Sequence, residues 1–245
     1  FLKVVLSELR VFGAFANLGE KIRSDFGETP ITAFQGVLKR LENDPAYSPI
    51  DPKQAVSLLF GLLAHARQGL SSEELTGLFI QALGMEDNEV SRRAASDSIY
   101  LYLRQVRPFL AYRDGSYDYF FESFRLAAKE RYVGEELPKR AAKEWHRLLA
   151  EYLMSQPLKR EQDGREFLNK HKLLEQPYQQ TCGGMEGELI KTLTDYWFLE
   201  TKIGTSGPQS LIDDCDFALN VNSTVPSKIS NSLHLILETT LLAAH

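Results

Sequence analysis

The sequence has few cysteines and no long apolar run. Its two cysteines, Cys182 and Cys215, are too few for a disulfide framework, and we expect both to be reduced thiols. No apolar run reaches the roughly 18 to 20 residues that a membrane-spanning helix needs, and no signal-peptide pattern opens the chain. The sequence therefore predicts a cytoplasmic protein without a disulfide scaffold or a membrane partner.

A strong charge of one sign is also missing. The 245 residues carry a net charge of -5, and this mild acidic balance gives no attraction to nucleic acid or to an anionic membrane. The hydrophobic fraction of 43% is that of an ordinary globular protein. We expect a piece of a longer polypeptide, because the chain begins at Phe1 inside an amphipathic pattern and ends at His245 without a helix stop signal.

Motifs that carry known chemistry are absent from the sequence. It contains no Gly-x-x-x-x-Gly-Lys-Ser/Thr loop, no dinucleotide fingerprint, no Cys-x-x-Cys and no His-Glu-x-x-His. The five histidines lack the spacing of metal ligands; they are His65, His146, His171, His234 and His245. We therefore expect no catalytic residue, no metal site and no cofactor bound by this segment alone.

Helical periodicity dominates what is present. Thr29-Pro30 and Asp51-Pro52 are typical N-cap and first-turn pairs, and Ser71 with Glu74 forms a capping box. The segment 53–67 is apolar on most faces, so it should be buried, and Gly69 is expected to end it. The pattern predicts a short helix or turn over 18–26. It predicts helices over 1–12, 30–42, 53–67, 72–83, 89–106, 123–133, 139–155, 165–176, 185–192, 195–202, 210–219 and 227–245.

One β-hairpin interrupts this helical pattern. Asp114-Gly115 lies between two short alternating runs, which is a strong hairpin signal. Helix, capped helix, helix, hairpin and helix is the order of a winged helix. The predicted fold class is therefore mainly α, with a helical region over 1–48, a winged helix with one β-hairpin over 49–134, and a helical domain over 135–245.

Several degenerate motifs follow one another along nearly the whole chain. They are Leu2-x-x-Val5-x-x-Glu8-Leu9-Arg10, Thr29-Pro30, Val37-Leu38-x-Arg40-Leu41-Glu42, Ala55-Val56-x-Leu58-Leu59, Gly69-Leu70-Ser71-x-Glu73-Glu74-Leu75, Leu103-Arg104-x-x-Arg107-Pro108-Phe109-Leu110, Phe124-Arg125-x-Ala127, Glu130-Arg131-Tyr132, His146-x-x-Leu149-Ala150-x-Tyr152, Glu175-Gln176-Pro177-Tyr178, Leu193-Thr194-Asp195-x-x-Phe198-Leu199-x-x-Lys202 and Leu211-Ile212-x-Asp214. In this order they resemble the lid and winged-helix part of STAND-type P-loop ATPases. These are the NACHT and NB-ARC proteins of innate-immunity, antiviral and cell-death signalling.

The resemblance implies a non-catalytic regulatory arm, with residues 1–48 as its lid. The parent protein would be an ATPase, and its own P-loop domain would bind ADP or ATP with Mg²⁺ and be the partner of this arm. Exchange of ADP for ATP would move the arm and permit homo-oligomerisation, a population shift between two packings. C-terminal sensor repeats would follow residue 245.

The resemblance also implies a nucleotide-facing stretch before Phe124-Arg125. The family usually places a histidine there, in contact with the ADP β-phosphate, whereas this chain has Phe121 followed by Glu122. A phenyl ring cannot donate a hydrogen bond, and a carboxylate repels phosphate. The nucleotide-facing residues would be Phe121, Ser123 and Arg125, with Ser123 or Arg125 making any phosphate contact. The alternative is that the phenylalanines belong to the core and Arg125 forms a salt bridge.

Two other functions are open from the sequence. The first is a winged-helix nucleic-acid-binding regulator with a helical effector domain; its contacts would be Arg92, Arg93, Arg104 and Arg113. Acidic neighbours such as Asp97 and Asp114 oppose these arginines, so we expect no nucleic-acid partner. The second is a helical adaptor whose segment 139–245 binds a partner protein.

Overall fold

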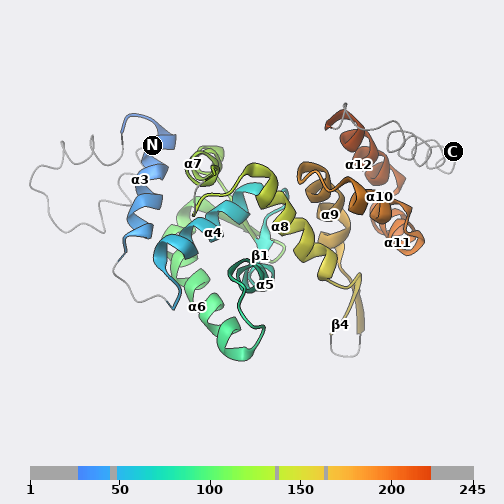
Figure 1. Ribbon diagram of the computed structural model, residues 1–245, viewed down its shortest axis with the longest axis horizontal. Coiled ribbons are helices and arrows are strands. Elements are labelled where there is room, and N and C mark those ends of the chain that lie inside the picture. The colour runs from blue at the N-terminus through green and yellow to red at the C-terminus, as the bar shows by residue number, and fades with distance from the viewer. Residues whose placement is uncertain (1–26, 45–48, 136–137, 163–164, 222–245) are drawn as a thin grey trace, which may run out of the picture. The chain divides into compact units, whose positions relative to one another are not determined.

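The computed structural model describes residues 27–44, 49–135, 138–162 and 165–221 (Figure 1). The chain divides into two compact units, Phe1–Ala141 and Ala142–His245. The described residues are mostly helical with a small antiparallel sheet, which confirms the predicted fold class. The segments 1–12, 18–26 and 227–245, for which the sequence predicts helices or a turn, lie outside the described residues. The predicted domain boundaries after residues 48 and 134 stay predictions.

The first unit contains the helices and the sheet of the winged helix. Its elements are α3 (Pro30–Glu42), α4 (Pro52–His65), β1 (Leu70–Ser71), α5 (Ser72–Leu83), α6 (Glu89–Val106), a 3-10 turn (Arg107–Phe109), β2 (Leu110–Arg113), β3 (Ser116–Tyr119) and α7 (Glu122–Tyr132). The predicted caps are confirmed, because the side chains of Thr29, Asp51 and Ser71 accept hydrogen bonds from the first turns of α3, α4 and α5.

The sheet has the strand order β1-β3-β2 and is antiparallel throughout. The predicted hairpin joins β2 and β3, and it turns through Asp114 at φ 50° and Gly115 at φ 82°. Two successive residues with positive φ give a turn whose twist matches that of the strands. The order α4-β1-α5-α6-β2-β3 is therefore that of a winged helix, and α7 follows it.

Gly69 is needed by the sheet. The sequence had suggested that it ends a helix, and this prediction was wrong. Helix α4 ends at His65, because Ala66 adopts an extended conformation with ψ 136°. Gly69 has φ 75°, and a Cβ atom at this position would lie 2.3 Å from the carbonyl oxygen of Tyr117. The absence of a side chain thus allows β1 to enter the sheet next to β3.

Helix α3 packs on α7 and α4 (Figure 1). Aromatic residues fill this contact. The ring of Phe34 stacks on that of Phe124 at 4.5 Å between centroids, and the edge of Phe109 meets it at 5.5 Å. Helix α4 is buried at every residue from Ala55 to its end, which confirms the prediction that it is central. The helix before the winged helix therefore shares one core with it.

The second unit is helical with one further hairpin. Its elements are α8 (Ala142–Ser155), β4 (Lys159–Gln162), β5 (Arg165–Leu168), α9 (Lys170–Cys182), α10 (Glu186–Thr194), α11 (Tyr196–Ser206) and α12 (Pro208–Val221). The β4–β5 hairpin was not predicted, and the helix expected from residue 165 begins at Lys170 instead. Within the described ranges, no helix is long and apolar enough to cross a membrane.

Pro177 lies inside α9, although the helix predicted over 165–176 ended before it. Proline has no N–H, so the carbonyl of Leu173, four residues earlier, loses its helical donor. The ammonium of Lys202 on α11 donates to that carbonyl at 2.7 Å. The same ammonium lies 2.7 Å from a carboxylate oxygen of Asp214 on α12. A contact from another helix thus replaces the hydrogen bond that Pro177 removes.

Both cysteines are thiols in this structure. Cys215 belongs to the apolar cluster that joins α10 and α12, together with Leu189, Leu193 and Leu211. Burial raises the pKa of the Cys215 thiol to about 12, so this thiol stays protonated at neutral pH. It is therefore a packing residue and not a nucleophile.

Candidate functional site

The segment that would face a nucleotide begins at Phe121, the N-cap residue of α7. Its side chain makes no capping hydrogen bond, and its ring lies 6.1 Å from that of Phe34 and 4.9 Å from that of Phe120. The ring is half-buried and contributes to the aromatic contact between α3 and α7. Phe121 therefore joins the core of the first unit at the start of this helix.

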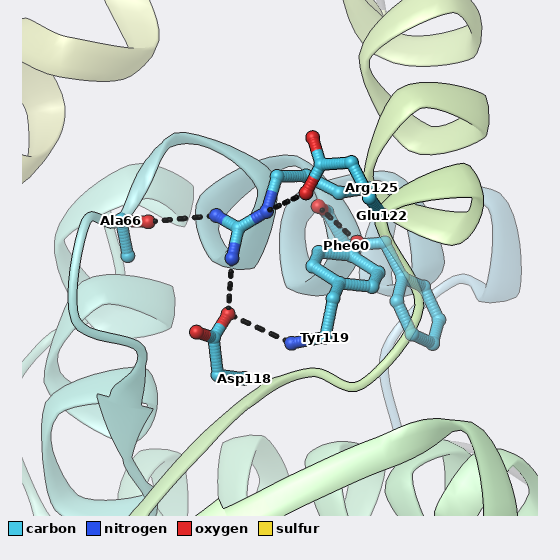
Figure 2. Close-up of polar contacts among 6 residues, drawn as sticks. All are labelled: Phe60, Ala66, Asp118, Tyr119, Glu122 and Arg125. Atoms are coloured by element: carbon cyan, nitrogen blue, oxygen red, sulfur yellow. Dashed lines mark hydrogen bonds and ion pairs between the residues drawn. The ribbon is translucent and has the colours of Figure 1, made fainter.

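Arg125, one turn further along α7, connects three elements of the winged helix (Figure 2). Its Nη1 donates to the carbonyl of Ala66 at 3.1 Å, and its Nη2 donates to Asp118 on β3 at 2.7 Å. Its Nε lies 3.4 Å from the exposed carboxylate of Glu122. The guanidinium thus satisfies the carbonyl that follows α4 and fixes the start of α7 against β3.

Tyr119 also contacts the guanidinium of Arg125, through the face of its ring. The cation lies 5.5 Å from the centroid of the Tyr119 ring, and the phenol donates to the carbonyl of Phe60 at 2.8 Å. Burial raises the pKa of Tyr119 well above its ordinary value, against the opposing effect of Arg125. The phenol therefore remains a hydrogen-bond donor at physiological pH.

Ser123 differs from its two neighbours in the predicted set. It lies in the first turn of α7 and is half-buried. Among the described residues, its hydroxyl has no hydrogen-bond partner. Of the three residues predicted to face a nucleotide, Ser123 is thus the one whose polar group is not already used inside the first unit. That these residues face a nucleotide stays a prediction.

Comparisons of this chain with protein-family models, with curated proteins and with solved structures found no match.

The four arginines of the nucleic-acid hypothesis lie on α6 and on the hairpin. Arg92 forms two hydrogen bonds with Asp87, at 2.6 and 2.8 Å, and Arg93 lies 3.8 Å from Asp97. Arg104 and Arg113 are exposed, and neither has a partner among the described residues. Helix α6 therefore carries charges of both signs. Of the four arginines, Arg92 and Arg93 are already paired with carboxylates.

A second polar connection, which the sequence did not indicate, joins α3 to the end of α7. Glu42 receives hydrogen bonds from Arg131 at 2.7 and 2.5 Å and from the phenol of Tyr132 at 2.8 Å. The hydrogen bond to Glu42 raises the pKa of Arg131, and burial raises that of Tyr132 well above its ordinary value. Arg131 and Tyr132 lie 89 and 90 positions after Glu42, so no local sequence pattern indicates these contacts.

We expect the conservative replacement Arg125→Lys to destabilise the first unit by about 1–3 kcal/mol. A single ammonium cannot reproduce the planar fork that reaches both Asp118 and the Ala66 carbonyl. Urea unfolding followed by far-UV circular dichroism measures the change. Arg107→Lys is the matched control, because Arg107 is exposed and has no partner among the described residues. Equal midpoints for the two variants would show that the Arg125 contacts contribute nothing.

Proposed function

We propose that this chain is a non-catalytic regulatory arm of a cytoplasmic STAND-type signalling ATPase. The arm packs on the P-loop domain of the parent protein while ADP with Mg²⁺ is bound there. It moves away when ATP replaces ADP, and the parent then forms a homo-oligomer. The proposal rests on the ordered motifs of the sequence together with a winged helix that has a preceding helix packed against it.

The contact of Phe34 with the start of α7 is the observation that supports this proposal best. Phe34 belongs to α3, in the region that resembles the lid, and Phe121 and Phe124 belong to the segment that resembles the nucleotide-facing stretch of the winged helix. The rings of Phe34 and Phe124 are nearly parallel, with an interplanar angle of 8°. A displacement of α7 at its first turn would therefore displace α3 as well, because packed aromatic cores move as discrete blocks.

The proposed switch needs a contact that distinguishes the two nucleotides. A ligand shifts an equilibrium only by the difference between its affinities for the two states. With phenylalanine in place of the family's histidine, the hydroxyl of Ser123 and the amides of Glu122 and Ser123 are the donors left in the first turn of α7 for a phosphate, because the amide of Phe124 already donates to the carbonyl of Phe121. We therefore assign the ADP-dependent contact to this turn rather than to a side chain at position 121.

The mixed charge of α6 argues against the nucleic-acid alternative. Phosphate contacts by unpaired cations supply most of the affinity of a protein for duplex DNA. Arg92 and Arg93 already lie next to carboxylates, and Arg113 is followed by Asp114. A regulatory arm that moves within a larger protein needs no unpaired cations for phosphate contacts. We therefore prefer the regulatory-arm proposal to the nucleic-acid alternative.

The test begins with the gene that encodes this chain. We expect a Gly-x-x-x-x-Gly-Lys-Ser/Thr loop within about 250 residues upstream of Phe1, roughly one ATPase domain. That upstream domain, purified separately, should bind this chain more tightly with ADP and Mg²⁺ than with a non-hydrolysable ATP analogue, as measured by calorimetry. Ser123→Ala should reduce this preference for ADP, because the hydroxyl donor is lost.

Two results would overturn the proposal. One is an upstream region without a P-loop, and the other is equal affinity of the two parts with either nucleotide. ATP hydrolysis by this chain alone would also contradict it, because the proposal makes the chain non-catalytic. The control variant is Ser96→Ala, an exposed serine on α6 that lies outside the first turn of α7.

A further inference from the structure

A cavity of about 420 Å³ lies at the other end of α7, between this helix, α3 and the start of α4. Its polar walls come from four parts of the first unit: α3, the first turn of α4, the end of α7 and the segment after it. The lining residues are Gln35, Glu42, Lys53, Glu130, Arg131, Tyr132, Pro138 and Lys139. Three of these are cations, although the chain as a whole is acidic.

The backbone around Lys139 is held in place by hydrogen bonds. Ser57 on α4 donates to the carbonyl of Pro138 at 2.8 Å. The amide of Arg140 donates to the carbonyl of Tyr132 at 3.1 Å, and the amide of Gly134 donates to the carbonyl of Arg140 at 3.0 Å. Pro138 and Arg140, on either side of Lys139, are therefore both held by hydrogen bonds. The backbone position from which the Lys139 side chain extends is fixed in this way.

The Lys139 side chain itself lies over Gly134. A Cβ atom at Gly134 would lie 2.8 Å from Cδ of Lys139, which is closer than two carbon atoms pack. The aliphatic stem thus occupies the space that a side chain at Gly134 would take. Lys139 is also one of the residues that line the cavity.

Lys53 reaches the same cavity from α4. It precedes Ser57 by four residues, so the two side chains share one face of the helix. Since Ser57 bonds the backbone of Pro138, Lys53 is placed next to the loop that carries Lys139. Neither lysine has a hydrogen bond or ion pair among the described residues. Both side chains are exposed, and an anion bound at this cavity would be attracted by both charges.

The remaining charges of the cavity are partly neutralised. Arg131 uses Nε and Nη2 on Glu42, which leaves its Nη1 without a hydrogen bond among the described residues. Glu130 accepts a hydrogen bond from Gln35 at 2.8 Å. The free donors of the cavity are therefore cationic, and Glu130 is the one carboxylate on its described walls that no cation pairs.

We propose that this cavity binds a small phosphate-class anion through Lys53, Lys139 and the free Nη1 of Arg131. The site is distinct from the proposed nucleotide contact, because Arg131 lies ten positions after Phe121, a distance of about 15 Å along the helix. An anion bound there contacts α4, α7 and the segment after α7, and it is connected to α3 through Arg131, which donates to Glu42, so it stabilises the packing of α3 on the winged helix.

Calorimetric titration of the full chain with pyrophosphate tests the proposal, at pH 7 and constant ionic strength without divalent cations. We expect saturable binding to one site. Lys53→Gln and Lys139→Gln should each weaken it about tenfold, because each removes one charge-assisted hydrogen bond. Glu130→Gln should strengthen binding several-fold, since it removes the opposing charge and keeps the acceptor for Gln35. Gly134→Ala should weaken binding by displacing Lys139.

Lys129→Gln is the matched control, because Lys129 is an exposed lysine of α7 that does not line the cavity. Circular dichroism of each variant establishes that it is folded. Absence of saturable heat in the unmodified chain overturns the proposal, and so does an equal affinity of Lys129→Gln and the double variant of Lys53 and Lys139. Because no nucleotide or second domain takes part, either outcome is independent of the regulatory-arm proposal.

Discussion

Replacing Lys202 with methionine is expected to destabilise the second unit by about 3–5 kcal/mol, the usual cost of breaking a buried ion pair from one side. The ammonium is fully buried, and its partner Asp214 is only 6% exposed. The variant would remove the buried cation that faces the Asp214 carboxylate, and it would also remove the ammonium that donates to the carbonyl of Leu173. Both tryptophans of the chain, Trp145 and Trp197, lie in this unit, so tryptophan fluorescence in urea measures the effect directly.

Two further variants separate the charge from the hydrogen bond. The double variant Lys202→Met with Asp214→Leu should recover most of the loss, because no buried charge remains. Adding Pro177→Ala should recover more, since an alanine N–H can again donate to Leu173. Lys170→Met, at an exposed lysine, is the control and should change stability by less than about 0.5 kcal/mol. A loss below about 1 kcal/mol for Lys202→Met alone would contradict the argument.

The helix starts of the first unit could be predicted because their signals are local. Thr29 and Ser71 each accept a hydrogen bond from the amide three residues later, and the side chains of Thr32 and Glu74 accept one from the amide of the cap residue. All partners of such a box lie within four residues, so tertiary packing does not alter it. The turn at Asp114-Gly115 is local in the same sense, because the two residues alone determine its backbone.

The wrong predictions concern features that distant residues decide. Pro177 stays inside α9 because Lys202, 29 positions from Leu173, supplies the missing donor. The β4–β5 hairpin has the same Asp-Gly dipeptide, at 163 and 164, as the hairpin that was predicted. Its first strand, Lys159–Gln162, contains no apolar residue, so it lacks the alternation that identifies a half-buried strand.

The sequence predicts which residues form the candidate site but not the contacts that these residues make. The motif order directs attention to Phe121, Ser123 and Arg125, and it says nothing of the carbonyl of Ala66 that Arg125 reaches 59 positions away. The pairing of Glu42 with Arg131 is equally invisible, because the two lie on different helices. The contacts between side chains of different elements depend on the tertiary fold, which cannot be read from a single sequence.

Replacing Phe34 with alanine is expected to cost the first unit about 3–5 kcal/mol, the range for large-to-small changes at buried aromatic residues. Phe34 is 1% exposed, and its ring contacts those of Phe109, Phe121 and Phe124. Far-UV circular dichroism in urea measures the loss. Phe120→Ala is the matched control, because that ring is 59% exposed and should contribute less than about 1 kcal/mol.

The Phe34→Ala variant also tests whether α3 and the winged helix act as one body. Its contacts all lie in the first unit, so the tryptophan transition of the second unit should keep its midpoint. Hydrogen exchange should become faster in α3 and in the first turn of α7 together, since one ring packs both. Faster exchange in α3 alone would mean that α3 opens without α7. The regulatory-arm proposal would then lose the connection through which nucleotide exchange at α7 moves the lid.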